Sequence, residues 1–403
     1  MSELAPVPPR ERVLALDVLR GFALGGVLIG NMVLYSGRWA ARGPAPDSST
    51  LDQIAGWFLG IFVQSKSQTL LTLLFGLGFA IQLLRAEERG APATGLHVRR
   101  LVVLLALGAL HVTLLWWGDV TWTYAVSGFG LLAFLHTSTR ARVGWALGLL
   151  LVPAIVVKSF PDVHLAAVRV FIEPRDFPAH TGRIVEAIRH AGHLELAWEH
   201  PRYALVWCTN IYAWYFFWTL GGFLLGSVAG KLRWFDRDGA DHLPVFRRLA
   251  AWGGALAAVT TAAFVLQRLG VLPLRAYGTW GRAVSAASMQ LGFLAMALAY
   301  AGILVLLMQR PAWRRILRVL APAGRMPLTT YFSQSVICTF LFYGWGLGWS
   351  GSVGVAGCVG LALAIFGAQV AIAHLWLRRF RFGPLEWVWR SAVYRKRQPM
   401  RIA

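Results

Sequence analysis

Long apolar segments alternate with short polar ones along almost the whole chain. A helix needs about 20 apolar residues to cross the hydrocarbon core of a bilayer, and ten segments approach that length. They are residues 13–35, 55–85, 98–117, 120–137, 142–158, 204–229, 249–270, 284–308, 326–349 and 352–377. The pattern predicts an all-α polytopic membrane protein with about ten transmembrane helices.

The second segment carries a polar interruption. Residues 57–63 are apolar, residues 64–69 (Gln-Ser-Lys-Ser-Gln-Thr) are polar, and residues 70–84 are apolar again. One alternative is a single long helix with a polar patch. Irregular backbone at membrane depth needs protein or a cavity around it, so we favour a short interfacial helix before a span that begins near Ser67.

Two further regions differ from simple spans. Residues 159–203 form the one long loop, in which 163–172 and 184–198 have the pattern of amphipathic helices. Gly383-Pro384 predicts the start of a helix over 383–394, because proline favours the first helical position. Glu386 and Arg390 are spaced i, i+4 on that helix, as in an ion pair. We expect this helix to pack against the inner face of the bundle.

Composition supports the membrane assignment. The chain of 403 residues is 57% hydrophobic and 14% charged, whereas soluble domains carry roughly a quarter of charged residues. The net charge of +21 comes from short loops between apolar segments, which suits anionic lipid headgroups and not nucleic acid. Most of the 39 Lys and Arg residues lie inside if the N-terminus is inside. We therefore expect an N-in, C-in topology with anionic lipids at the inner face.

Soluble-enzyme and metal motifs are missing from the sequence. There is no P-loop, dinucleotide-binding glycine motif, nucleophile elbow or H-E-x-x-H. The three cysteines lie in apolar segments, so we expect neither disulfides nor a zinc site. His190-x-x-His193 and His200 have the residue types of a metal cluster, but scattered surface histidines of a polar loop are the simpler interpretation. We expect no metal.

The first segment contains two charges, Asp17 and Arg20. Ionisable groups within the hydrocarbon are costly, and they usually face the bundle interior or a water-filled cavity. On a helix these two residues share a face with Asn31, and Gly21/Gly25 and Gly26/Gly30 have the spacing that lets another helix approach closely. A central first helix follows, although Asp17 and Arg20 could also simply neutralise each other.

His111 is the single histidine in the middle of an otherwise apolar helix. Its ordinary pKa lies near neutrality, which suits a general base, although a buried histidine can also be structural. Asp119 follows in a tight turn, where it either takes part in chemistry or caps a helix. The remaining polar residues within or beside spans are Lys66, Arg99, Arg100, Arg325, Tyr331 and Gln334. Arg99, Arg100 and Arg325 could also serve as topology charges.

Several of these residues belong to motifs that resemble the YeiB-like integral membrane family. The motifs are Asp17-x-x-Arg20-Gly21, Leu73-Leu-Phe75-Gly76-x-Gly78-Phe79, Arg99-Arg100, His111-x7-Asp119, Gly324-Arg325-Met-x-Leu-Thr-x-Tyr331-x-x-Gln334-Ser335 and Gly383-Pro384-Leu-Glu386-Trp-x-Trp-Arg390. The C-terminal half of that family is catalogued as domain of unknown function 418. The resemblance implies an N-terminal bundle over 13–230 and a C-terminal transmembrane domain over 245–395, in a bacterial plasma membrane.

The opening motif also resembles a wider set of transmembrane acyltransferases, which includes heparan-glucosaminide N-acetyltransferase. This resemblance implies an acyl group moved from cytoplasmic acyl-CoA, such as acetyl-CoA, to a hydroxyl or amine acceptor reached from the outer side or from lipid. The acceptor would be a small molecule or a glycan. The lysosomal relatives use a histidine near the start of the second span, and residues 36–51 contain none. His111 replaces it here on chemical grounds alone.

We assign roles to the candidate residues on this basis. Arg20, Arg325, Arg99 and Arg100 would hold the phosphates of the coenzyme. Asp17 would orient Arg20 or the pantetheine arm, with Tyr331 and Gln334 beside them. His111 would be the general base, with Lys66 or Asn31 as oxyanion donor and Asp119 as a further catalytic residue. Whether the chain forms a homodimer stays open.

Depth separates the two charged clusters. A rise of about 1.5 Å per residue places Asp17 about 6 Å inside the membrane and His111 about 20 Å along its own span. They would lie roughly 14 Å apart in depth, so a direct Asp17–His111 pair is not expected. Two polar clusters at different depths equally fit a transporter or exporter in which His111 relays protons.

Overall fold

The computed structural model describes residues 13–38, 49–88, 93–160, 177–210 and 214–402. Regular structure within these ranges is helical, apart from one isolated bridge between Phe380 and Arg401. Seven helical stretches in the described ranges are long and apolar enough to cross a membrane. They are α1 (Leu14–Tyr35), α2 with α3 (Thr50–Glu88), Thr94–Leu114 of α4, α6 (Thr139–Ser159), η5 with α11 (Asp236–Arg268), α12 (Gly278–Met308) and α16 (Val355–Trp376). The all-helical membrane class is therefore as the sequence predicts.

The other predicted spans are shorter or divided. Residues 120–137 contain α5 (Thr121–Leu132) followed by turns, and residues 326–349 contain α15 (Pro327–Phe342). The predicted span 204–229 falls on two helices, α9 (His193–Asn210) and α10 (Tyr215–Lys231). Apolar composition continues across that junction, which explains why one helix was expected there.

The second segment is divided as expected. Helix α2 (Thr50–Phe58) continues into a π-helical turn, η3 (Leu59–Val63), and α3 (Lys66–Glu88) begins one residue before Ser67. Ser65 has a φ of 64°, the left-handed conformation that ends a helix and reorients the chain. The polar interruption is therefore a genuine break between two helices.

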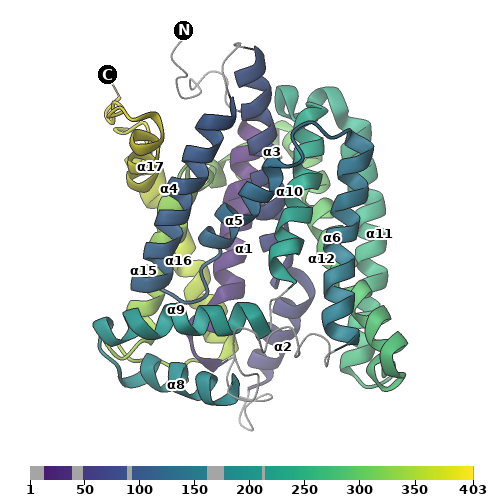
Figure 1. Ribbon diagram of the computed structural model, residues 1–403, viewed down its shortest axis with the longest axis vertical. Helices are drawn as coiled ribbons and strands as arrows, with labels where there is room; N and C mark the ends of the chain where they lie inside the picture. The colour runs from purple at the N-terminus through teal and green to yellow at the C-terminus, as the bar shows by residue number, and fades with distance from the viewer. Residues whose placement is uncertain (1–12, 39–48, 89–92, 161–176, 211–213, 403) are drawn as a thin grey trace.

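The long loop was only partly predicted. The expected helix at 163–172 lies outside the described residues. The expected helix at 184–198 is wrong in its bounds, because α8 (Phe177–His190) ends before Gly192 and α9 begins at His193. Glycine weakens a helix interior, so a break at this position is reasonable. Together α8 and α9 lie across one end of the bundle (Figure 1).

Helix α1 runs through the middle of the bundle and packs against α3, α14, α15 and α16 (Figure 1). Helices α6, α10, α11 and α12 form the layer on one side, and α4 lies with α17 (Pro384–Tyr394) on the other. The start of α1 and α17 are at one end of the molecule, while α2, α8 and α9 are at the opposite end. In full, α4 is Ala93–Leu114 and α11 is Leu243–Arg268. The short elements are η5 (Asp236–His242), η6 (Leu274–Ala276), α13 (Pro311–Leu317), η7 (Arg318–Leu320) and α14 (Ala321–Arg325).

Glycines permit a close helix crossing in the bundle core. A Cβ on Gly324 would collide with the backbone carbonyl of Asp17, and a Cβ on Gly21 would collide with the carbonyl of Leu320. The backbones of α1 and of the η7–α14 segment therefore touch directly. This contact brings the Asp17–Arg20 turn of α1 beside Arg325, the last residue of α14.

Candidate functional site

A cavity of about 350 Å³ opens between α1, α3, α4, α15 and α17. We call it the cationic cavity, because five arginines line it against two carboxylates, an excess of three positive charges. The arginines are Arg20, Arg85, Arg100, Arg325 and Arg390, and the carboxylates are Asp17 and Glu386. Its volume is in the range of small-molecule and cofactor sites. A polyanionic ligand matches this charge.

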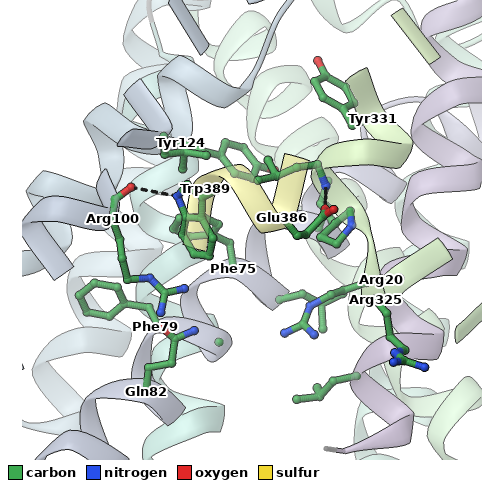
Figure 2. A pocket seen from close by; sticks show the side chains of 18 of the residues that line it. Arg20, Phe75, Phe79, Gln82, Arg100, Tyr124, Arg325, Tyr331, Glu386 and Trp389 are labelled. Carbon is green, nitrogen blue, oxygen red and sulfur yellow. Dashed lines mark hydrogen bonds between the residues drawn. The ribbon is translucent and has the colours of Figure 1, made fainter. Parts of the chain in front are cut away.

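The arginines of the cationic cavity differ in how they are held. Arg20 Nη1 lies 3.2 Å from Asp17 Oδ1, one turn earlier on α1. The guanidinium of Arg100 lies 4.5 Å from the ring centre of Trp389. Arg325 makes no hydrogen bond or ion pair within the described part of the chain, and its Nε is buried. Figure 2 shows Arg20 and Arg325 on one side of the cavity and Arg100 on the other. Arg325 is thus available to a ligand without first breaking a contact.

Helix α17 closes one wall of the cavity, and Glu386 fixes it there. The Glu386 carboxylate accepts hydrogen bonds from the backbone N–H groups of Leu328 (2.6 Å) and Thr329 (3.1 Å) and from the Thr329 hydroxyl (2.6 Å). These N–H groups belong to the first turn of α15. The N–H groups of a first turn have no hydrogen-bond partner within their own helix. The expected ion pair between Glu386 and Arg390 does not form, because α15 occupies the carboxylate and Arg390 lies over Phe382. Burial raises the pKa of the Glu386 carboxyl, although these hydrogen bonds lower it.

A buried polar chain lies deeper in the bundle, around His111 on α4. His111 Nδ1 lies 3.1 Å from Asp119 Oδ1, and both side chains are 0% exposed. The two atoms lie this close without forming a hydrogen bond. His111 Nε2 lies 2.8 Å from the Ser335 hydroxyl, which is 2.7 Å from the Tyr35 hydroxyl. Four helices or their ends thus contribute to one chain of polar groups.

Asp119 serves two elements at once. Its second oxygen, Oδ2, accepts a hydrogen bond of 3.1 Å from the backbone N–H of Trp122, in the first turn of α5. The carboxylate therefore caps α5 and faces His111 with its other oxygen. The helix cap expected from the sequence is confirmed, and a part for Asp119 in chemistry stays a prediction.

A second, smaller hollow lies toward the α8–α9 end of the molecule. This polar pocket of about 90 Å³ is lined by amide, hydroxyl and carboxylate groups, together with aromatic rings. Its polar residues are Asn31, Gln64, Ser65, Ser67, Gln68, Asp119, Thr123 and Tyr215. Val120 lines both hollows, and its N–H donates to the Tyr331 hydroxyl at 3.3 Å. The Tyr331 ring stacks on His111 with centres 5.3 Å apart, so one tyrosine separates the cationic cavity from the buried histidine.

Comparison with known proteins gives a consistent result along the chain. Residues 229–396 match the family described as "Protein of unknown function (DUF418)". The chain is 30% identical to "Uncharacterized protein YxaH" of Bacillus subtilis, over 99% of this chain and 98% of that one. It is 26% identical to "Uncharacterized protein YeiB" of Escherichia coli, over 96% of this chain and 98% of that one. The chain belongs to the YeiB-like DUF418 family.

No solved structure is significantly similar to this DUF418 protein. Its relatives are bacterial, and its apolar helices indicate a multi-pass membrane protein.

Four residues expected at the site of this DUF418 protein do not line either hollow. His111 is buried behind Tyr331, and the other three are held elsewhere. Lys66 donates to the backbone carbonyl of Gly60 and lies 5.2 Å from the ring centre of Phe293. Gln334 bonds Gln369 Oε1 at 3.2 Å and the Leu24 carbonyl at 3.5 Å. Arg99 is absent from the cavity wall to which its neighbour Arg100 contributes. Arg99 is directed away from that wall because a helix presents adjacent residues about 100° apart.

The structure also adds residues that the sequence argument did not assign. Arg85 and Arg390 join the cationic cavity, and Ser335 and Tyr35 join the chain at His111. Ser335 stands within the family motif and four residues after Tyr331, which places both on one face of α15. That spacing was the available signal in the sequence for Ser335.

The single polar face expected on α1 is divided, since Asp17 and Arg20 line the cationic cavity while Asn31 lines the polar pocket.

The loop histidines do not gather around a metal site. His190 and His193 are exposed, whereas His200 is buried 5.8 Å from the ring centre of Tyr343. His200 therefore differs from the surface histidine that was expected. Within the ranges that the structure describes, no group of three or more His, Cys, Asp or Glu is placed to hold a metal ion.

Proposed function

We propose that the protein is a membrane acyltransferase that takes an acyl group from cytoplasmic acyl-CoA and passes it to a hydroxyl or amine acceptor. The observation that supports this proposal is the buried Asp119–His111 pair. It lies behind the contact of Tyr331 with Val120, which separates the cationic cavity from the polar pocket. A base at that position has a donor site on one side and an acceptor site on the other.

The cationic cavity supports acyl-CoA as the donor. Arginine guanidinium groups bind phosphate oxygens through charge-assisted, often bidentate hydrogen bonds. Arg20, Arg100 and Arg325 would take these phosphates, with Asp17 keeping Arg20 in position. The aromatic side chains of Phe75 and Phe79 offer an apolar wall to the uncharged arm and its acyl group (Figure 2).

His111 supports proton transfer at the reacting hydroxyl. Asp119 lies against Nδ1, favours the tautomer that carries a proton there, and stabilises the imidazolium that forms when Nε2 accepts a second proton. Asn31 lies in the polar pocket with Asp119, where its amide can hydrogen-bond an acceptor. Lys66, Arg99 and Gln334 have other partners or positions and take no part in this proposal.

Binding and transfer can be tested separately with purified protein in lipid nanodiscs and labelled acetyl-CoA. We expect Arg325→Ala to weaken acetyl-CoA binding by roughly 10- to 100-fold, because a hydrogen bond to a charged group contributes about 1.5–3 kcal/mol. Arg99→Ala, one residue from the cavity-lining Arg100, is the matched control and should bind like the wild type. His111→Asn should bind acetyl-CoA and fail to transfer its acyl group. A wild-type protein that does not bind acyl-CoA would overturn the proposal.

A transporter is the second candidate, and one observation favours it. The two hollows lie along successive halves of α1 and share Val120, whose N–H bonds the Tyr331 hydroxyl, as the two access routes of a transporter would meet at a gate. A transporter would carry substrate into proteoliposomes without cleaving a thioester. Release of free coenzyme thiol by the wild type but not by His111→Asn favours the transferase.

A further inference from the structure

The hydroxyl of Ser335 is directed differently from those of Ser333 and Thr339, its neighbours on α15. In membrane helices, serine and threonine commonly bond a carbonyl of their own helix. Thr339 bonds the Ser335 carbonyl at 2.8 Å, and Ser333 bonds the Thr330 carbonyl at 3.0 Å. Ser335 instead meets His111 and Tyr35, which belong to two other helices. Its side chain is held away from its own helix at the centre of the polar chain.

The polar chain has a consistent direction. We assign the His111 proton to Nδ1, which faces Asp119 Oδ1 at 3.1 Å, and this leaves the Nε2 lone pair toward Ser335. Ser335 then donates to Nε2 at 2.8 Å, and Tyr35 donates to the Ser335 oxygen at 2.7 Å. A carboxylate, an imidazole and a serine hydroxyl in this order are the parts that activate a serine nucleophile, and such triads are recognised by geometry and not by fold.

We propose that Ser335 is a catalytic nucleophile, activated by His111 and Asp119, which carries the acyl group as an ester between donor and acceptor. This inference rests on the proposed acyltransferase function and assigns its covalent step. It assigns a role to the fully buried Ser335 hydroxyl, which the proposed binding of acyl-CoA does not involve.

Each half of the proposed reaction balances. First, Ser335 Oγ bonds to the thioester carbonyl carbon and its proton moves to His111 Nε2. The carbon–sulfur bond then breaks, and the departing sulfur takes that proton to give the free thiol. In the second half the acceptor hydroxyl gives its proton to Nε2 and bonds to the ester carbonyl carbon. The bond to Ser335 Oγ breaks, and Oγ takes the proton back.

Tyr331 controls access to this serine. It lines the cationic cavity, stacks on His111, and stands one helical turn before Ser335 on α15. A thioester in the cavity reaches Ser335 only when the Tyr331 side chain rotates. That rotation also breaks the bond from the Val120 N–H, which leaves a backbone donor beside the reaction centre of the type that stabilises oxyanions.

The covalent intermediate can be trapped without an acceptor. We expect wild-type protein incubated with radiolabelled acetyl-CoA and quenched in acid to carry one acetyl group, located on Ser335 by peptide mass spectrometry. We expect a fluorophosphonate probe, which reacts with activated serines independently of coenzyme, to label the same residue. Ser335→Ala should lose both labels and still bind acetyl-CoA, and His111→Asn should lose both because Ser335 is no longer activated.

Matched variants separate this step from folding and from the proposed function. Ser333→Ala, on the same helix, should keep both labels, and Ser335→Cys should carry the acyl group as a thioester. Transfer of acetyl by a wild type that never bears acetyl or phosphonate on Ser335, or by Ser335→Ala at the wild-type rate, would overturn the nucleophile and leave the acyltransferase standing. Fluorophosphonate labelling of Ser335 in a protein that does not bind acyl-CoA would instead support the nucleophile and overturn acyl-CoA as its donor.

Discussion

Two buried carboxylates, those of Asp119 and Glu386, fix the ends of helices that carry residues of the site. Asp119 caps the start of α5 and faces His111 with its other oxygen. Glu386 on α17 bonds the start of α15 with both oxygens. Placing a carboxylate at a helix N-terminus satisfies N–H groups that have no partner in the helix and interacts favourably with the helix dipole. The site residues are therefore positioned by the same bonds that fix the ends of their helices.

Glu386 predicts that the docking of α17 depends on pH. Its pKa is raised in the folded protein, so its contribution to stability is complete below the ordinary glutamate pKa and is lost as pH rises through the raised value. We expect the amides of α17 to be better protected from hydrogen exchange at about pH 5 than at about pH 8, after correction for intrinsic exchange rates. Glu386→Gln keeps an uncharged group of the same shape and should remove this difference. Equal pH dependence in both proteins would contradict the prediction.

At the scale of elements, the α1–α14 crossing places the charges of the cationic cavity. Gly21 and Gly324 let two backbones touch, and this contact sets Arg20 beside Arg325. Small residues commonly allow such close approach in membrane proteins, where packing replaces the hydrophobic effect as the force between helices. The glycine spacing of the first segment therefore serves the site as well as the fold.

A single methyl group should test this crossing. We expect Gly324→Ala to destabilise the protein by about 1–3 kcal/mol, since its Cβ meets the Asp17 carbonyl and the helices must separate. It should also weaken acyl-CoA binding by displacing Arg325. Gly367→Ala on α16, where the added Cβ meets nothing within 4 Å, is the control and should be neutral or stabilising. Chemical unfolding in detergent measures both, and equal stability of the two variants would refute the crossing.

At the scale of the whole molecule, two hollows at different depths share one wall. The cationic cavity lies beside α17, the polar pocket lies toward α8 and α9, and Tyr331 and Val120 separate them. With the N-terminus inside, as the charge pattern predicts, the cationic cavity faces the cytoplasm. A charged donor and a separate acceptor would then approach from opposite sides.

Single cysteines should report these two faces. In a background without Cys208, Cys338 and Cys358, we expect Gln82→Cys in the cationic cavity to react with a membrane-impermeant maleimide from the cytoplasmic side. Gln64→Cys in the polar pocket should react from the opposite side. Intact cells expose only the outer side to the reagent, and inverted vesicles expose only the cytoplasmic side. Labelling of Gln64→Cys in intact cells and of Gln82→Cys in inverted vesicles therefore measures the orientation. Reaction of both cysteines from one side would contradict the arrangement.

The sequence by itself determined the helical membrane class, the break before α3 and the start of α17. These features are local, because a run of about 20 apolar residues, a polar interruption or a Gly-Pro pair acts within its own segment. It also selected His111, Asp119, Arg20 and Arg325 as polar groups that a bilayer makes costly. Local patterns failed where composition does not change, as at the junction of α9 and α10.

Only the tertiary structure decided which of these groups meet. Ser335 reaches His111 across 224 positions of sequence, and Glu386 contacts α15 instead of the neighbouring Arg390 on its own helix. Arg100 enters the cationic cavity while Arg99 does not. Such pairings depend on how helices cross and rotate against one another. Packing of the whole bundle sets those angles, whereas the apolar pattern of any one helix leaves them open.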